Sequence, residues 1–129
     1  MAATSKSHPI DWFEIPVRDL DRAQTFYETL LGTSMRREAI GPQTLVLFDY
    51  DDASGVGGCL LAGPTIPAPS ENGTLVYLRA EPTLDAVLAR LPKAGGRLLT
   101  PKVQLPGDMG CFAHVADSEG NRVGLHALT

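Results

Sequence analysis

The sequence has few cysteines, no excess of positive charge and no long hydrophobic run, and each of these shortages argues against a class of protein. Cys59 and Cys111 are the only two cysteines among 129 residues, far apart and in no metal-binding spacing, so we expect small buried thiols. The net charge of −4 supplies no basic surface for nucleic acid. No secretory signal or membrane-spanning run is evident. The sequence therefore predicts a cytoplasmic protein without nucleic-acid or membrane partners.

The rest of the composition is typical of a small globular protein. Hydrophobic residues make up 43% of the chain and charged residues 20%. A chain of 129 residues can bury one good core but is too short for two independent domains. We therefore expect a single domain over residues 1–129.

Residues 12–32 and 75–96 repeat one pattern of a buried strand, a capping residue, an amphipathic helix and a final glycine. A constant shift of 64 residues (84 minus 20) superimposes Leu84 on Leu20. Strand-like runs separated by Gly and Pro turns follow both helices. A repeat with a fixed offset indicates a duplicated structural module. Each half is therefore expected to be a βαβββ unit.

The predicted fold class is α+β, with two tandem βαβββ modules over residues 10–62 and 74–128. Between them, residues 63–73 contain three prolines and no periodicity, which is typical of a stiff connector.

The expected helices have recognisable start and stop residues. Asp19 and Thr83 are suitable N-caps, and Gly32 and Gly95 follow the last apolar positions of the two helices. Pro92 is expected to distort the last turn of the second helix.

A short turn near the C-terminus fixes the pairing of the last two expected strands. Residues 118–120 form a three-residue hairpin loop with glycine at the position that favours positive φ. This loop places His114 opposite Gly124 and diagonal to His126. Diagonal neighbours lie roughly 7–8 Å apart, close enough for long side chains to meet.

Three segments resemble signature segments of the vicinal oxygen chelate superfamily, the group of glyoxalase I, bleomycin-resistance proteins and extradiol dioxygenases. They are VRDLDRA at residues 17–23, FYETLLG at residues 26–32 and DSEGN at residues 117–121. The resemblance implies paired modules whose strands form a curved mixed sheet around a cavity, with the helices outside and often a homodimer. In the metal-dependent members it also implies a divalent cation that chelates vicinal oxygens of the substrate.

The sequence departs from this family pattern at the metal ligands. The resemblance places the first ligand on Trp12, the second on Gly58 or Cys59, the third on Leu75 and the fourth on Gly124. Indole, isobutyl and hydrogen side chains offer no donor to zinc or to a hard cation. We therefore expect no metal at the family site and no cofactor.

Strand alternation indicates which side chains replace the missing ligands in the cavity. Residues two apart on a strand share a face, and the hairpin register adds further neighbours. The expected lining consists of Trp12, Glu14, Tyr77, Phe112, His114 and His126. Apolar walls with a few polar groups are typical of sites for small organic ligands. Glu14 and His114 are the candidate catalytic residues, and the other four are candidate ligand-binding residues.

Every one of these residues also has a structural interpretation. Glu14 can be satisfied by a backbone donor or by Arg79, and His114 can be a hydrogen-bonded core residue. His126 lies near the C-terminus and can be exposed. Trp12 and other aromatic residues on strands are usually part of a core.

Three functions stay open at this stage. The first, which we favour, is a metal-independent site for a small organic ligand that uses Glu14 with Tyr77 and a histidine. The second is a lyase-type or dioxygenase-type metalloenzyme with relocated ligands, for instance Glu14, His114 and His126. The third is a protein that sequesters a drug without chemistry. The sequence does not separate binding from turnover, nor a cavity within one chain from one shared by two.

Overall fold

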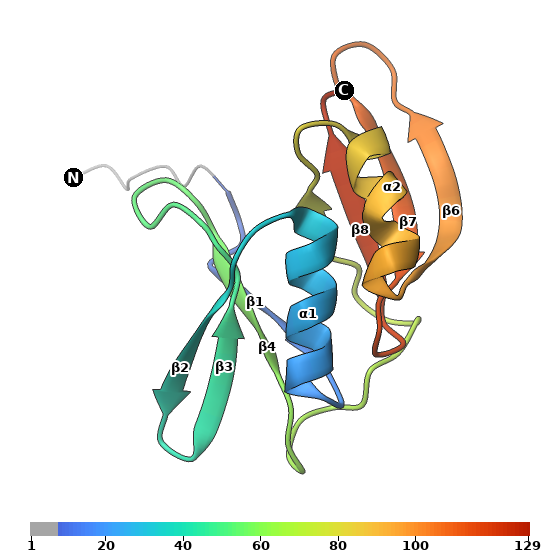
Figure 1. The fold of residues 1–129 in the computed structure, drawn as a ribbon. Coiled ribbons are helices and arrows are strands. Elements are labelled where there is room, and N and C mark those ends of the chain that lie inside the picture. The colour runs from blue at the N-terminus through green and yellow to red at the C-terminus, as the bar shows by residue number, and fades with distance from the viewer. Residues whose placement is uncertain (1–7) are drawn as a thin grey trace, which may run out of the picture.

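Each half of the chain folds into a four-stranded mixed sheet with one helix, as the computed structural model shows for residues 8–129 (Figure 1). The first half contains β1 (Trp12–Pro16), α1 (Leu20–Leu31), β2 (Arg36–Ile40), β3 (Gln43–Leu47) and β4 (Gly57–Leu61). The second half contains β5 (Tyr77–Arg79), α2 (Leu84–Ala94), β6 (Arg97–Gln104), β7 (Cys111–Ala116) and β8 (Arg122–Ala127).

The two sheets have the same topology. Sheet A has the strand order β1-β4-β3-β2, and sheet B has the order β5-β8-β7-β6. In each sheet the first strand pairs in parallel with the last strand of its module, and the other pairs are antiparallel. The predicted α+β class with two βαβββ modules is confirmed.

The local signals in the sequence predicted the helix ends well. The Asp19 side chain accepts a hydrogen bond from the Arg22 amide at 3.0 Å, and Gly32 ends α1 with a left-handed φ of 69°. Thr83 caps α2 in the same way, and Gly95 ends it. Asparagine, aspartate, serine and threonine oxygens satisfy the free amides of a first helical turn, which explains these positions. Pro92 lies inside α2 without ending it.

The hairpin register is also confirmed. The Asp117 amide donates to the Asn121 carbonyl at 2.9 Å, and Gly120 has a φ of 97°. His114 lies opposite Gly124, as expected. The strand expected over residues 74–80 is reduced to β5, because the Arg122 amide bonds to the connector instead of extending the ladder.

The helices make the main contact between the two halves. Figure 1 shows α1 and α2 side by side, with sheet A on one side of the pair and sheet B on the other. One hydrophobic cluster includes residues of both helices and of the strand faces that cover them. The strands form two separate sheets and no closed barrel, whereas the family resemblance implied one curved sheet around a cavity.

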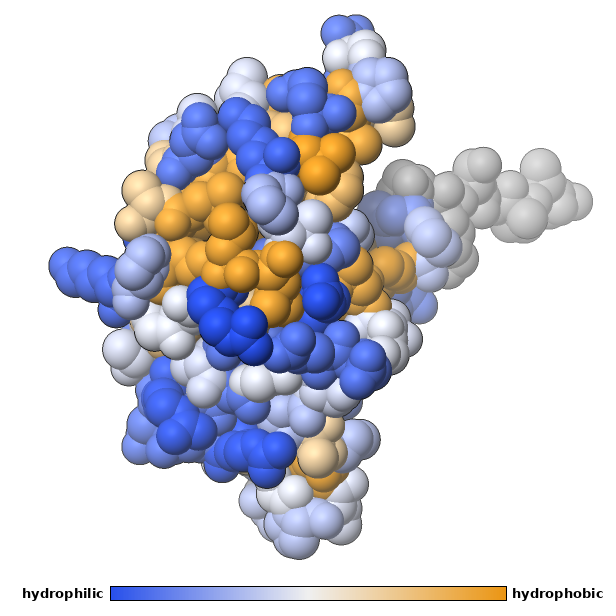
Figure 2. Space-filling view, turned by 90° about the vertical axis from the view of Figure 1, so that its right-hand side faces the viewer, coloured by the Kyte–Doolittle hydropathy of each residue, from blue (hydrophilic) through white to orange (hydrophobic). Residues whose placement is uncertain are grey.

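The faces of the sheets that point away from the helices, which we call the open faces, differ in how much they are covered. On sheet A, Ile66 of the connector packs against a small cluster of Leu45, Leu47, Cys59 and Leu61. On sheet B, Tyr77 and Val103 remain exposed. Figure 2 views the molecule from the side of sheet B and shows apolar surface interrupted by hydrophilic side chains.

A buried carboxylate joins the β7–β8 turn to the start of α1. Glu119 accepts hydrogen bonds from the amides of Arg18 and Asp19 at 3.0 and 2.9 Å. Arg22 completes the contact with two hydrogen bonds of 2.7 and 2.9 Å. The family-like segment at residues 117–121 therefore holds the two modules together.

A second buried carboxylate in the same turn reaches the core of α1. Asp117 accepts a hydrogen bond of 2.6 Å from the Tyr27 hydroxyl and further bonds from the amides of Glu119 and Asn121. Burial and, second, the negative charge of Asp117 raise the pKa of Tyr27 well above its ordinary value, so the phenol stays a donor.

Both cysteines are free and buried, as predicted. Across residues 8–129, neither helix has the length and apolar character needed to cross a membrane.

Candidate functional site

Two aromatic rings and two imidazoles gather on the open face of sheet B. The ring centroid of Tyr77 lies 5.9 Å from that of Phe112 and 5.5 Å from that of His114, and the last two are 5.4 Å apart. His126 is paired with Phe112 across β7 and β8. The structure therefore brings together four of the six residues that strand alternation predicted for a cavity.

Gly124 makes this cluster possible. It lies between Tyr77 on β5 and His114 on β7, and a Cβ added to it would come within 2.4 Å of the Tyr77 ring. The phenol ring thus occupies the space of the missing side chain. Gly124 is also where the family pattern expects an acidic metal ligand, and the Tyr77 ring occupies the space that such a side chain would need.

Hydrogen bonds fix both ring nitrogens of His114. The Tyr77 hydroxyl oxygen is 2.7 Å from Nε2, and Nη1 of Arg122 is 3.2 Å from Nδ1. Partial burial and, second, the positive charge of Arg122 lower the pKa of His114. The imidazole is therefore neutral at neutral pH.

His126 is held differently. Its Nε2 is 2.7 Å from the Met109 carbonyl oxygen, and because a carbonyl can only accept, Nε2 carries the proton. In the neutral ring Nδ1 is then an acceptor. No hydrogen bond of Nδ1 occurs within the residues that the structure describes.

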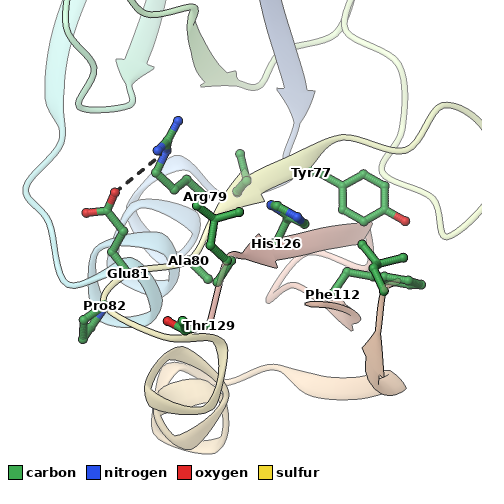
Figure 3. Close-up of a pocket in the computed structure, with 12 residues that line it drawn as sticks. Tyr77, Arg79, Ala80, Glu81, Pro82, Phe112, His126 and Thr129 are labelled. Atoms are coloured by element: carbon green, nitrogen blue, oxygen red, sulfur yellow. Dashed lines mark ion pairs between the residues drawn. The ribbon is translucent and has the colours of Figure 1, made fainter. Parts of the chain in front are cut away.

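A pocket of about 880 Å³ adjoins this cluster, in the volume range of small-molecule sites. Figure 3 shows Tyr77, Phe112 and His126 along it, with Arg79 and Glu81 at its other side. Arg79 and Glu81 are 3.8 Å apart, and their side chains are 83% and 70% exposed, so this ion pair is weak.

The remaining two predicted residues, Trp12 and Glu14, lie on β1 of the other sheet. Both are exposed, and Trp12 contacts the Tyr50 ring with a centroid distance of 6.3 Å. Glu14 is paired with Cys59 on β4. Burial and, second, the negative charge of Glu14 raise the pKa of the Cys59 thiol to about 11, so this thiol is a poor nucleophile and metal ligand at neutral pH.

The residues present do not fit the family metal. Trp12, Leu75 and Gly124 supply no donor, and the Phe13 ring covers Gly58 so closely that an added Cβ would lie 2.4 Å from it. Within residues 8–129, no three His, Cys, Asp or Glu side chains are grouped in a way that could hold an ion. The alternative ligand set of Glu14, His114 and His126 is not brought together either, because the carboxylate is on sheet A and the imidazoles are on sheet B.

Protein purified without added metal should therefore contain far less than one transition-metal ion per chain. It should also show no glutathione-dependent conversion of methylglyoxal, since the glyoxalase I branch depends on its metal for that reaction. Elemental analysis by mass spectrometry measures the metal content directly. Stoichiometric zinc, nickel or iron would contradict the conclusion that these residues do not fit a metal ion.

Arg122 and Arg79 belong to this face, and the sequence reasoning did not assign them to the site. Strand alternation places both on this face, because Arg122 is two residues from Gly124 and Arg79 is two residues from Tyr77. Met109 could not be found in this way, because it contacts His126 from a loop.

Two βαβββ modules, each with one four-stranded mixed sheet and one helix, are the architecture of glyoxalase-like proteins, although the helices of this chain pack between the two sheets and not on the outside as the resemblance implied. The Glyoxalase/Bleomycin resistance protein/Dioxygenase superfamily profile matches residues 9–125. The chain belongs to this superfamily, as its signature segments indicated.

Solved structures show the same fold at low sequence identity. A glyoxalase-related enzyme from Fulvimarina pelagi is 17% identical, with a TM-score of 0.65 over 92% of this chain and 86% of that chain. A glyoxalase/bleomycin resistance protein from Albidiferax ferrireducens is 20% identical, with a TM-score of 0.67 over 92% and 97%. A glyoxalase I variant from Zea mays is 20% identical, with a TM-score of 0.68 over 98% of this chain and 49% of that longer chain. No curated protein sequence matches this chain.

Proposed function

We propose that this protein binds a small organic molecule on the open face of sheet B, without the family metal. The observation that carries the proposal is the aromatic and imidazole cluster of Tyr77, Phe112 and His114 beside a pocket of about 880 Å³. Proteins of this superfamily bind small organic ligands, which agrees with this proposal. This geometry supports binding.

The charges of this face favour a ligand that carries oxygen acceptors or negative charge. Arg79 and Arg122 are both on it, together with two imidazoles. Glu81 also lines the pocket, and it is only loosely paired with Arg79. A ligand with an apolar body and a polar oxygen end suits such a lining.

We propose that a second copy of this chain covers the exposed parts of both open faces. The open face of sheet A carries Glu14, Glu38 and Arg36, and its two carboxylates can pair with the basic side chains of sheet B. It also exposes Trp12 on β1 and Ile40 on β2, which a second copy of the chain could cover. In a homodimer of this kind, Trp12 and Glu14 of one protomer would complete the site on sheet B of its partner.

Titration with small aromatic carbonyl and carboxylate compounds should shift the backbone amide signals of Tyr77, Phe112 and His126 in a ¹⁵N–¹H NMR spectrum. Phe112→Ala should weaken binding about tenfold or more, because it removes one aromatic wall of the pocket. Leu98→Ala is the matched control, since Leu98 is an exposed apolar residue of the same sheet that pairs with Val115 instead of the cluster.

Equal loss of binding in both variants, or shifts confined to other regions, would contradict this site. The assembly is checked on the same samples by light scattering, which should give about twice the chain mass of 13.8 kDa. A monomer would remove Trp12 and Glu14 from the proposed site and leave the pocket on sheet B.

A further inference from the structure

A chain of three side chains crosses the open face of sheet B at positions that the family pattern does not use for its ligands. It runs from the Tyr77 hydroxyl to Nε2 of His114, and from Nδ1 of His114 to Nη1 of Arg122. The distances are 2.7 and 3.2 Å. Its members come from three adjacent strands, β5, β8 and β7, so the pairing of these strands fixes its geometry.

The chemistry of arginine determines where the protons are. A guanidinium has only N–H donors and stays charged, so Nδ1 of His114 must accept. In a neutral imidazole the proton is then on Nε2, which donates to the Tyr77 oxygen. Burial and the charge of Arg122 lower the pKa of His114 and keep the ring in this neutral form.

The Tyr77 hydroxyl therefore accepts from His114 and does not donate its own hydrogen to it. Among the described residues, His114 is the only hydrogen-bond partner of that hydroxyl. The Tyr77 side chain is 48% exposed and lines the pocket, so a molecule bound there can reach it. A hydroxyl that lacks an acceptor among residues 8–129, beside an apolar wall, is suited to recognise an acceptor on a ligand.

We propose that His114 and Arg122 orient Tyr77 as a hydrogen-bond donor to a carbonyl or carboxylate oxygen of a small organic ligand. The inference rests on the proposed function and specifies the ligand class of that same site. His114 and Arg122 are positioning residues in it, because both ring nitrogens of His114 are already engaged and neither faces the ligand. Tyr77 is the group that touches the ligand. The role that we assign to His114 differs from the catalytic role expected from the sequence.

The first test needs no ligand. Ring ¹⁵N chemical shifts of His114 should show the tautomer with the proton on Nε2. In Arg122→Met the preference of His114 for this tautomer should be lost, because the donor to Nδ1 is gone. In Arg122→Lys it should be restored at least in part, because lysine supplies a donor and a positive charge. The opposite tautomer in the wild-type protein would overturn the proposal.

The second test uses acetophenone, which has a carbonyl acceptor, and isopropylbenzene, which has a similar shape and no acceptor. Tyr77→Phe keeps the ring over Gly124 and removes only the hydroxyl. It should raise the dissociation constant of acetophenone about tenfold, which corresponds to the loss of one hydrogen bond. The dissociation constant of isopropylbenzene should not change. Arg122→Met should weaken acetophenone binding several-fold through the loss of orientation and leave isopropylbenzene binding unchanged.

The outcomes separate this proposal from the one on which it rests. If both probes bind at the pocket and Tyr77→Phe affects neither or both equally, the donor role of Tyr77 is wrong and the small-molecule site stands. If neither probe shifts the pocket signals up to its solubility limit, the small-molecule site is wrong and the ligand class falls with it.

Discussion

Replacement of Glu119 by alanine should lower the free energy of unfolding by about 2–3 kcal/mol, because it removes a buried acceptor of two backbone amides and of Arg22, whose own side chain is 53% exposed and can be solvated by water. The side chain of Glu119 is 0% exposed and accepts two hydrogen bonds from Arg22. Its loss would also leave the amides of Arg18 and Asp19 without their acceptor at the start of α1. Urea unfolding followed by circular dichroism measures this change.

The same carboxylate should make the fold sensitive to acid. Burial alone would raise the pKa of Glu119, but hydrogen bonds from Arg22, Ser118 and two backbone amides lower it from 4.5 to about 2. A group whose pKa is lower in the folded state stabilises the fold above its unfolded pKa, and this stability is lost as the pH falls toward the folded pKa. Between neutral pH and about pH 3, the wild type should lose about 2 kcal/mol more than Glu119→Gln.

Glu71→Ala is the matched control. Glu71 pairs with Arg97 at 2.9 Å, but this pair is on the surface and partly exposed. Its loss should cost less than about 1 kcal/mol, because solvent screens such pairs. If Glu119→Ala and Glu71→Ala unfold at the same urea concentration, the contact between the β7–β8 turn and α1 does not hold the modules together.

The elements of this fold could be predicted because their signals are local. Asp19 and Gly32 lie next to the helix that they delimit, and residues 118–120 lie inside the hairpin that they close. Strand alternation likewise showed that Tyr77 and His114 share a face. These properties depend on neighbours in the sequence, so a single sequence contains them.

What the sequence could not provide is which faces meet and which polar groups are buried. Alternation predicted one cavity that included Trp12 and Glu14, but these residues lie on a separate sheet. The partners of Glu119 are about a hundred residues away, as the separation of 101 to Arg18 illustrates. Apolar periodicity predicts buried hydrophobic faces, whereas a buried carboxylate in a polar turn has no such pattern.

The adjacent residues Phe13 and Glu14 point to opposite faces of β1. Substitutions at these two positions therefore test the core and the proposed site separately. Phe13 packs against the main hydrophobic cluster, with its ring centroid 5.3 Å from that of Phe48 and Gly58 beneath it. Phe13→Ala should lower the free energy of unfolding by about 3 kcal/mol, through lost burial and the cavity that remains. Gly58 lacks a side chain that could fill that cavity.

Glu14→Gln on the same strand should behave in the opposite way. The side chain is exposed, and glutamine preserves its shape while it removes the charge, so the unfolding free energy should stay within about 1 kcal/mol of the wild type. In a dimer that completes the pocket, the same change should alter the affinity for acetophenone. Thermal melting of both variants and titration of Glu14→Gln measure the two effects. A Glu14→Gln protein that melts far below the wild type would make the carboxylate structural, and unchanged affinity would limit the site to the residues of sheet B.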